Sequence, residues 1–179
     1  GRAGNVIGGG DWAANRIVPD CIRSWQLKKP VLIRNPYSTR PWQHVLEPLS
    51  GYLSLASNLY SSRKINGEAF NFGPRINQNK TVIQLVKEMK THWKKVKWKI
   101  KKDKTKKKEY KLLKLNSLKS KKVLGWEPVL TFKDSVKLTT LWYKEYYSKK
   151  IDCFSLSSKQ LFFYEKKLMK HFRNKKIKV

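Results

Sequence analysis

Residues 1–20 read GRAGNVIGGGDWAANRIVPD, and this stretch decides the fold class. Its apolar residues Val6 and Ile7 run into three consecutive glycines, which predicts the end of a buried strand followed by a glycine-rich loop. Glycines adopt positive φ easily and let a ligand come close to the backbone. A helix is expected to begin near Asn15, with Pro19 in its first turn. A strand, a glycine loop and a helix in this order favour an α/β fold with a phosphate-binding loop.

The rest of the chain continues to alternate strands and helices. Strands are predicted at 30–34 and 69–73, and helices at 45–60, 81–93, 131–147 and 159–171, with one more ending near Gly125. The 45–60 helix carries Leu46, Leu49, Leu53, Ala56 and Leu59 along one face, and the 81–93 helix is capped by Thr81 and directs Val82, Leu85, Val86 and Met89 inward. Because a parallel sheet needs more strands than these, the pattern predicts an α/β domain that has lost its beginning.

The composition is that of a folded domain. The chain has 179 residues, of which 40% are apolar, so it can bury a core. It has no uninterrupted run of about 18 apolar residues and no signal-peptide pattern. Cys21 and Cys153 lie far apart without metal-ligand spacing, and we expect free thiols, no metal site and a cytoplasmic protein.

The net charge of +29 is unevenly distributed. Residues 87–122 hold seventeen lysines against three acidic residues. Such a field attracts nucleic acid or anionic lipid without sequence specificity. The basic residues are almost all lysine, without the interleaved arginines and aromatics of base-stacking surfaces, so the alternative is a solvated lysine-rich surface.

Four motifs carry a family resemblance: RAGNVIGGGDW (2–12), IRNP (33–36), RPWQHVLEP (40–48) and LGWEP (124–128). Together they resemble the C-terminal half of the CDP-glucose 4,6-dehydratase family, which are extended short-chain dehydrogenases/reductases acting on nucleotide sugars. The resemblance covers residues 1–164 and leaves 165–179 as a basic tail, expected to be frayed beyond His171. It implies an NAD(P)-binding Rossmann-type fold, of which this chain holds the last sheet strands and the small substrate-binding lobe.

The resemblance also implies a reaction. In the family, NAD takes a hydride from C4 of CDP-glucose, water leaves across C5 and C6, and the hydride returns to C6 to give CDP-4-dehydro-6-deoxy-D-glucose. The implied partners of the intact enzyme are CDP-glucose and a second copy of itself, and no membrane.

The chain lacks two parts that this family uses. It has no G-x-G-x-x-G loop, and its two Tyr-x-x-x-Lys sequences, Tyr60 with Lys64 and Tyr146 with Lys150, are not where the family places its catalytic pair. NAD and the catalytic residues are therefore expected in a preceding N-terminal half. On this interpretation the chain is a fragment that alone binds no NAD and catalyses nothing.

The resemblance assigns substrate-binding roles to four residues in the first part of the chain. Asn5 matches an asparagine beside the pyrophosphate, and the alternative is an amide that serves its own loop. Arg16, in the first turn of a helix, is implied to reach the diphosphate, and Arg40 to hold it in a fork. Arg34 matches a position that lines the pyrimidine pocket. The alternative for each arginine is a solvated surface side chain.

A fifth candidate lies in the lysine-rich segment. Glu109 aligns with an acidic residue near the ribose, although Lys108 stands where this family usually has histidine. A solvated acidic residue is the alternative.

Other functions remain open at this stage. The chain could be part of another nucleotide-sugar epimerase or dehydratase of the same superfamily, or a binding module without chemistry. A basic nucleic-acid-binding protein rests on charge alone. The isolated chain could also be unstable, because its strands lack sheet partners and leave an edge exposed.

Overall fold

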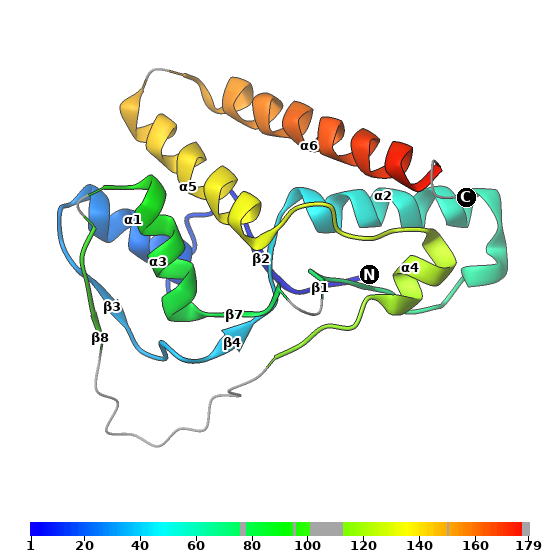
Figure 1. Ribbon diagram of the computed structural model, residues 1–179, viewed down its shortest axis with the longest axis horizontal. Coiled ribbons are helices and arrows are strands. Elements are labelled where there is room, and N and C mark those ends of the chain that lie inside the picture. The colour runs from blue at the N-terminus through cyan, green and yellow to red at the C-terminus, as the bar shows by residue number, and fades with distance from the viewer. Residues whose placement is uncertain (76–77, 95, 101–112, 150, 177–179) are drawn as a thin grey trace.

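The computed structural model describes residues 1–75, 78–94, 96–100, 113–149 and 151–176 (Figure 1). The helices are α1 (Ile17–Gln26), α2 (Leu46–Ser61), α3 (Val82–His92), α4 (Leu118–Leu124), α5 (Phe132–Ser148) and α6 (Cys153–Lys176), with a short 3-10 helix at Arg63–Ile65. The strands are β1 (Arg2–Ala3), β2 (Asn5–Ile7), β3 (Val31–Ile33), β4 (Thr39–Arg40), β5 (Trp42–His44), β6 (Asn71–Phe72), β7 (Lys80–Thr81) and β8 (Trp98–Ile100).

The strands form pairs that are mostly parallel. β1 pairs with β6, β2 with β5 and β3 with β8 in parallel, and β4 pairs with β7 in antiparallel orientation. The predicted α/β alternation is confirmed. Strand β5 was not predicted: all three of its residues are buried although Gln43 and His44 are polar. It therefore lacks the apolar alternation that identifies a half-buried strand.

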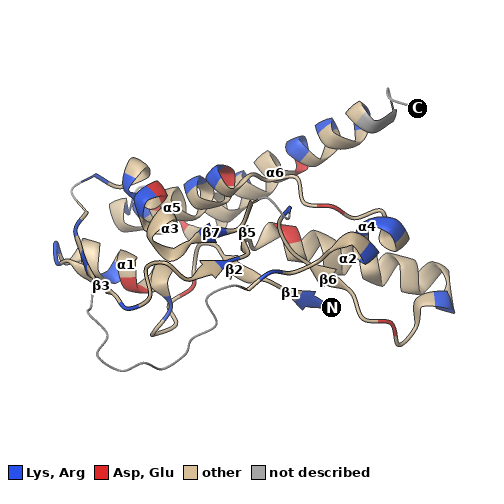
Figure 2. Cartoon of the chain, turned by 60° about the horizontal axis from the view of Figure 1, so that its bottom comes forward, with Lys and Arg blue, Asp and Glu red and all other residues tan. Residues whose placement is uncertain are grey.

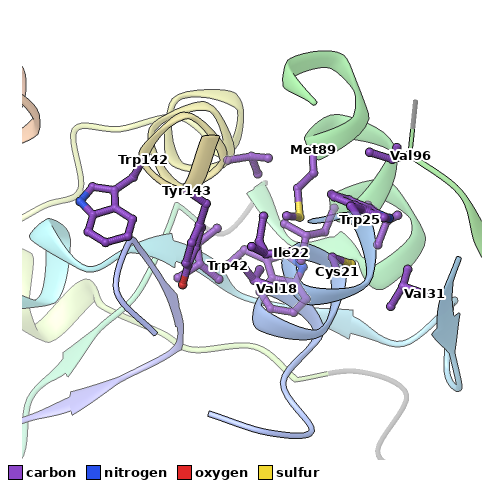
Figure 3. Packing of buried hydrophobic residues seen from close by; sticks show 14 of the residues in the cluster. Val18, Cys21, Ile22, Trp25, Val31, Trp42, Met89, Val96, Trp142 and Tyr143 are labelled. Carbon is purple, nitrogen blue, oxygen red and sulfur yellow. The ribbon is translucent and has the colours of Figure 1, made fainter. Parts of the chain in front are cut away.

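The main core lies between α1, α3 and α5. Figure 3 shows Cys21 and Ile22 of α1 beside Met89 of α3, with Tyr143 of α5 nearby, and all four side chains belong to one buried cluster. The inward face predicted for α3 is confirmed, since Leu85 is completely buried. The predicted cap at Thr81 is also present, as a reciprocal capping box with Gln84.

A smaller core lies between α2, α4 and β6. Phe70, Phe72, Leu124 and Trp126 form it, and the rings of Phe72 and Trp126 meet edge to face with centroids 5.0 Å apart. A Cβ atom on Gly51 would lie 2.3 Å from the Phe72 ring, so only glycine lets α2 approach this strand so closely.

Helix α2 buries a different face from the one that carries its leucines. Its buried residues are Glu47, Pro48 and Gly51, whereas Leu49 and Leu53 are 47% and 73% exposed. The apolar spacing thus predicted the helix correctly, but Leu49 and Leu53 face outward, whereas Leu55 packs against the smaller core.

Glu47 joins α2 to the C-terminal elements. It accepts hydrogen bonds from the backbone N–H groups of Val129 and Leu130, at 2.9 and 2.6 Å, and from the Tyr164 hydroxyl at 2.9 Å. Helix α6, which lies beside α5 and crosses α2 in Figure 1, is held there by Tyr164.

Helix α6 is longer than its pattern predicted. It passes residue 164, where the basic tail was expected to begin, without a break. It also continues to Lys176, past His171, where fraying was expected. Within the described ranges, no helix has the length and apolar character needed to cross a bilayer.

Candidate functional site

A cleft of about 1050 Å³ lies where β2, β3 and β4 meet the start of α1. Four of the five predicted site residues line it: Asn5, Arg16, Arg34 and Arg40. They are separated by up to 35 positions in the sequence and come from four different elements or their flanking loops. The fifth, Glu109, lies outside the described residues.

Asn5 begins β2 and stands opposite Trp42 of β5 in the parallel pair. Gly4 precedes it, and a Cβ atom there would lie 2.9 Å from the carbonyl oxygen of Pro41. The close approach of the two strands therefore requires glycine. Trp42 also lines the cleft and donates its indole N–H to the carbonyl of Lys80 at 2.9 Å, which holds the ring in place.

Arg16 is the N-cap residue of α1, with extended backbone and no side-chain cap. Its guanidinium lies 3.2 Å from the Asp11 carboxylate and its side chain is 66% exposed, so the pair is a weak, solvent-screened contact. The first-turn backbone at Ile17 and Val18 lines the same cleft. N–H groups at a helix start have no partner within the helix and carry a partial positive charge, which favours an anion at this end of the cleft.

Arg34 and Arg40 approach the cleft from β3 and β4. The guanidinium of Arg34 donates to the side-chain oxygen of Asn15 at 3.3 Å, and that of Arg40 to the carbonyl of Thr39 at 3.0 Å. Both of these hydrogen bonds go to neutral oxygens and help to orient the guanidinium groups.

Helix α5 packs against the glycine loop through Tyr143 and Trp142. The Tyr143 hydroxyl donates to the carbonyl of Asp11 at 2.6 Å, and burial raises the pKa of Tyr143 to about 12, so it stays a donor at neutral pH. A Cβ atom on Gly9 would lie 2.1 Å from the Trp142 ring. Gly9 thus makes room for an indole. This packing does not fit the dinucleotide-binding loop that a G-x-G-x-x-G sequence forms.

Five polar residues of the cleft were not predicted as site residues: Asp11, Asn15, Asp20, Asn35 and Ser38. Asn15 has a φ of 61°, which places it in the left-handed region at the end of the glycine loop. Asn35 and Ser38 lie between β3 and β4. Polar residues that follow directly after a strand were the sequence signal that could have identified them.

Apolar residues form part of the same cleft. Leu32 is 54% exposed and lines it together with Pro19 and Val82. A base needs such an apolar or planar wall.

Two titratable residues noted in the sequence, His44 and Tyr60, do not line this cleft. His44 is buried on β5, where burial lowers its pKa to about 4, and its Nδ1 accepts from the N–H of Leu46 at 3.4 Å. Tyr60 is 96% exposed at the end of α2, away from the cleft-lining residues.

Comparison with curated sequences supports the resemblance to the CDP-glucose 4,6-dehydratase family. The chain is 45% identical over 143 residues to the CDP-glucose 4,6-dehydratase of Salmonella typhimurium, a match that covers 80% of this chain and 40% of that protein. The chain therefore spans less than half the length of this relative. No protein-family model matches the chain.

Solved structures show the same fold. The UDP-glucuronic acid 4-epimerase of Bacillus cereus, in complex with UDP-glucuronic acid and NAD, superposes with a TM-score of 0.68 at 18% identity, covering 82% of this chain and 45% of that one. The dTDP-glucose 4,6-dehydratase of Bacillus anthracis, in complex with NAD, gives 0.61 at 20% identity, covering 83% and 45%. By sequence the chain resembles CDP-glucose 4,6-dehydratase, and by fold it corresponds to the C-terminal part of an extended short-chain dehydrogenase/reductase.

Proposed function

We propose that this chain supplies the nucleoside-diphosphate-sugar clasp of a CDP-glucose 4,6-dehydratase. The observation that carries the proposal is the convergence of Asn5, Arg16, Arg34 and Arg40 on one cleft. Asn5, Arg34 and Arg40 belong to motifs that resemble the dehydratase family, and the similarity to the Salmonella enzyme at 45% identity supports the same assignment.

The chemistry of the cleft suits a nucleoside diphosphate. A diphosphate carries two negative charges near neutral pH, and guanidinium groups recognise its oxygens through paired N–H donors. We assign Arg40 and Arg16 to the diphosphate, with the start of α1 as an additional electropositive group. Asn5 would donate its amide beside the pyrophosphate, and Arg34 would stack on or hydrogen-bond the cytosine.

Dehydration of CDP-glucose requires NAD, which supplies hydride transfer at C4 and C6 when bound. The glycine loop of this chain does not fit the dinucleotide, and we propose that residues outside the chain hold NAD. This chain would bind and orient the nucleotide part of the substrate. We further propose that the enzyme so formed acts in the cytoplasm as a homodimer.

Binding of CDP to the purified chain tests this function. We expect saturable binding by isothermal titration calorimetry, weakened about tenfold or more in Arg40→Ala, because a charge-assisted fork to phosphate is lost. Arg63→Ala is the matched control, since Arg63 is an exposed arginine that does not line the cleft.

Two results would contradict the proposal. Equal CDP affinity in Arg40→Ala and wild type would remove the cleft from the binding site. DNA binding with a steep salt dependence and no competition by CDP would favour the basic nucleic-acid-binding alternative.

A further inference from the structure

Helix α6 carries a stripe of exposed apolar side chains, which we call the outer face of α6 and define as Phe154, Leu161, Phe162, Met169 and Phe172. The exposed fractions of Phe154 and Phe162 are 81% and 60%. Intervals of seven residues join Phe154 to Leu161 and Phe162 to Met169, and an interval of eleven joins Leu161 to Phe172. Each interval returns to nearly the same side of an α-helix, so the stripe runs along most of α6.

The opposite side of α6 attaches the helix to the rest of the molecule, largely through polar contacts. Leu156 and Tyr164 are buried there, and the Tyr164 hydroxyl donates to the buried carboxylate of α2 at 2.9 Å. Farther along, Lys167 lies 3.3 Å from a carboxylate of α5, and His171 lies 2.8 Å from that of Glu127. A surface helix normally directs its apolar stripe toward the core. Because α6 directs five apolar side chains away from it, the outer face is a candidate binding surface.

A row of cations lies along one flank of the outer face. Lys159, Lys166, Lys170 and Arg173 are all exposed and follow one another at intervals of seven, four and three residues. The Nζ atom of Lys166 lies 4.3 Å from the centroid of the Phe162 ring, so the cations and the apolar stripe belong to one surface. Glu165 is the acidic residue of α6. In Figure 2 the C-terminal part of α6, with its blue segments, extends beyond the other elements.

This combination narrows the class of partner. Nucleic acid would engage the cations but would leave the apolar side chains in water. A second copy of the chain would bring two rows of cations together at a net charge of +29 per chain, which opposes association. The surface of a membrane with anionic lipids accepts both parts. Its headgroups attract the cations, and apolar side chains enter the boundary between headgroups and acyl chains. Long lysine side chains can then extend from the helix to the headgroups.

We propose that the outer face of α6 binds the surface of a membrane that contains anionic phospholipids, with the helix lying in the plane of that surface. The family resemblance implied no membrane partner, but it ends at residue 164, so Met169, Lys170 and Phe172 lie beyond it. The contact is peripheral and leaves the substrate cleft free, since α6 contributes no residue to it. The proposal does not depend on CDP binding.

Co-sedimentation of the purified chain with lipid vesicles tests the proposal. The probe is vesicles of phosphatidylglycerol and phosphatidylcholine in equal parts, and vesicles of phosphatidylcholine alone are the reference. We expect the chain to sediment with the anionic vesicles at least about tenfold more strongly than with the neutral ones. Binding should weaken when salt is raised from about 0.1 M to about 0.5 M, because the headgroup charge is then screened.

Two double variants separate the apolar part from the charged part. Phe162→Ser with Met169→Ser removes two side chains of the stripe and should lower the partition coefficient about tenfold or more. Its matched control is Leu53→Ser with Tyr60→Ser, since these two apolar side chains are exposed on α2. The control should bind vesicles like wild type.

The charged part is tested by Lys166→Gln with Lys170→Gln, which should also lower the partition coefficient about tenfold or more. Lys29→Gln with Lys64→Gln is the control, because it removes the same charge from exposed positions outside α6 and should change binding less than about twofold. Far-UV circular dichroism of each variant before mixing shows whether it is folded. Phe154→Ser replaces the first double variant if that variant is unfolded.

The results decide the proposal as follows. Loss of anionic-vesicle binding in both α6 variants, with retention in both controls, supports it. No sedimentation of the wild-type chain with anionic vesicles overturns it, as does equal sedimentation with neutral vesicles. Equal loss in the α6 variants and their controls also overturns it, because the contact would then be spread over the whole basic surface. Loss in the lysine variant alone overturns the apolar contact and points to a purely electrostatic partner such as nucleic acid.

Discussion

Helices α3 and α2 have similar apolar periodicity but use it in opposite ways. In α3 the apolar residues Leu85, Val86 and Met89 are almost completely buried in the main core. In α2 Leu49 and Leu53 face outward, whereas a carboxylate, a proline and a glycine are buried. The comparison shows that apolar spacing identifies a helix and its apolar face. Whether that face is buried depends on which other elements of the chain pack against it.

The largest expected effect lies on the α3 side of the comparison. Leu85→Ala removes a completely buried side chain and leaves a cavity, so it should lower the free energy of unfolding by about 2–5 kcal/mol. Urea unfolding followed by circular dichroism measures this change. A loss below about 1 kcal/mol would show that the main core is loosely packed.

The buried anchor of α2 should make stability depend on pH. Burial raises the pKa of Glu47 to about 7, although hydrogen bonds from Leu130, Tyr164 and Val129 act against this shift. A raised folded-state pKa means that the stabilising contribution is complete below the unfolded pKa of 4.5 and is lost as pH rises through about 7. The change between these limits is about 3 kcal/mol.

Glu47→Gln should remove this part of the pH dependence while keeping an acceptor for the two backbone N–H groups. Urea midpoints at pH 4.5 and pH 8 in both proteins measure the difference. Identical slopes against pH in the variant and wild type would show that Glu47 does not titrate in this range.

The next prediction concerns the contact between Gly9 of the glycine loop and Trp142 of α5. Gly9→Ala places a methyl group against Trp142 and should lower the free energy of unfolding by about 1–3 kcal/mol. It should also weaken CDP binding, because the loop carries Asp11 and Asn15 into the cleft. Ala13→Ser, in the same loop, is the control and should change stability by less than about 0.5 kcal/mol. Equal thermal midpoints for the two variants would contradict the contact.

The smallest expected effect lies on the exposed side of α2, which carries Leu49 and Leu53. Leu53→Gln should change the free energy of unfolding of the isolated chain by less than about 0.5 kcal/mol, since the side chain is 73% exposed. It should reduce self-association in sedimentation experiments, because it interrupts an exposed apolar surface. A destabilisation as large as that of Leu85→Ala would place Leu53 in an internal contact instead.

Much of the fold could be predicted because its signals are local. The capping box at Thr81 and the left-handed C-cap at Gly125 mark helix ends within one turn of sequence. Strand β5 could not be predicted, because Gln43 and His44 are polar residues that are buried, and Gln43 donates to the carbonyl of Phe72, which is distant in the sequence.

The candidate site was predictable in part. The family resemblance identified Asn5, Arg16, Arg34 and Arg40, and the structure brings them to one cleft. Asn15 and Ser38 were missed, because their place in the cleft depends on how the glycine loop and β4 pack, which no local pattern encodes.

The sequence by itself determined the α/β alternation, the helix ends and the family resemblance, because spacing, capping and motif residues are properties of neighbouring positions. Only the tertiary structure decided that Leu49 and Leu53 of α2 face outward, that Glu47 is buried, and that Gly9 accommodates Trp142. Burial depends on which segments meet in space, and the same apolar periodicity is compatible with a core face or an uncovered one.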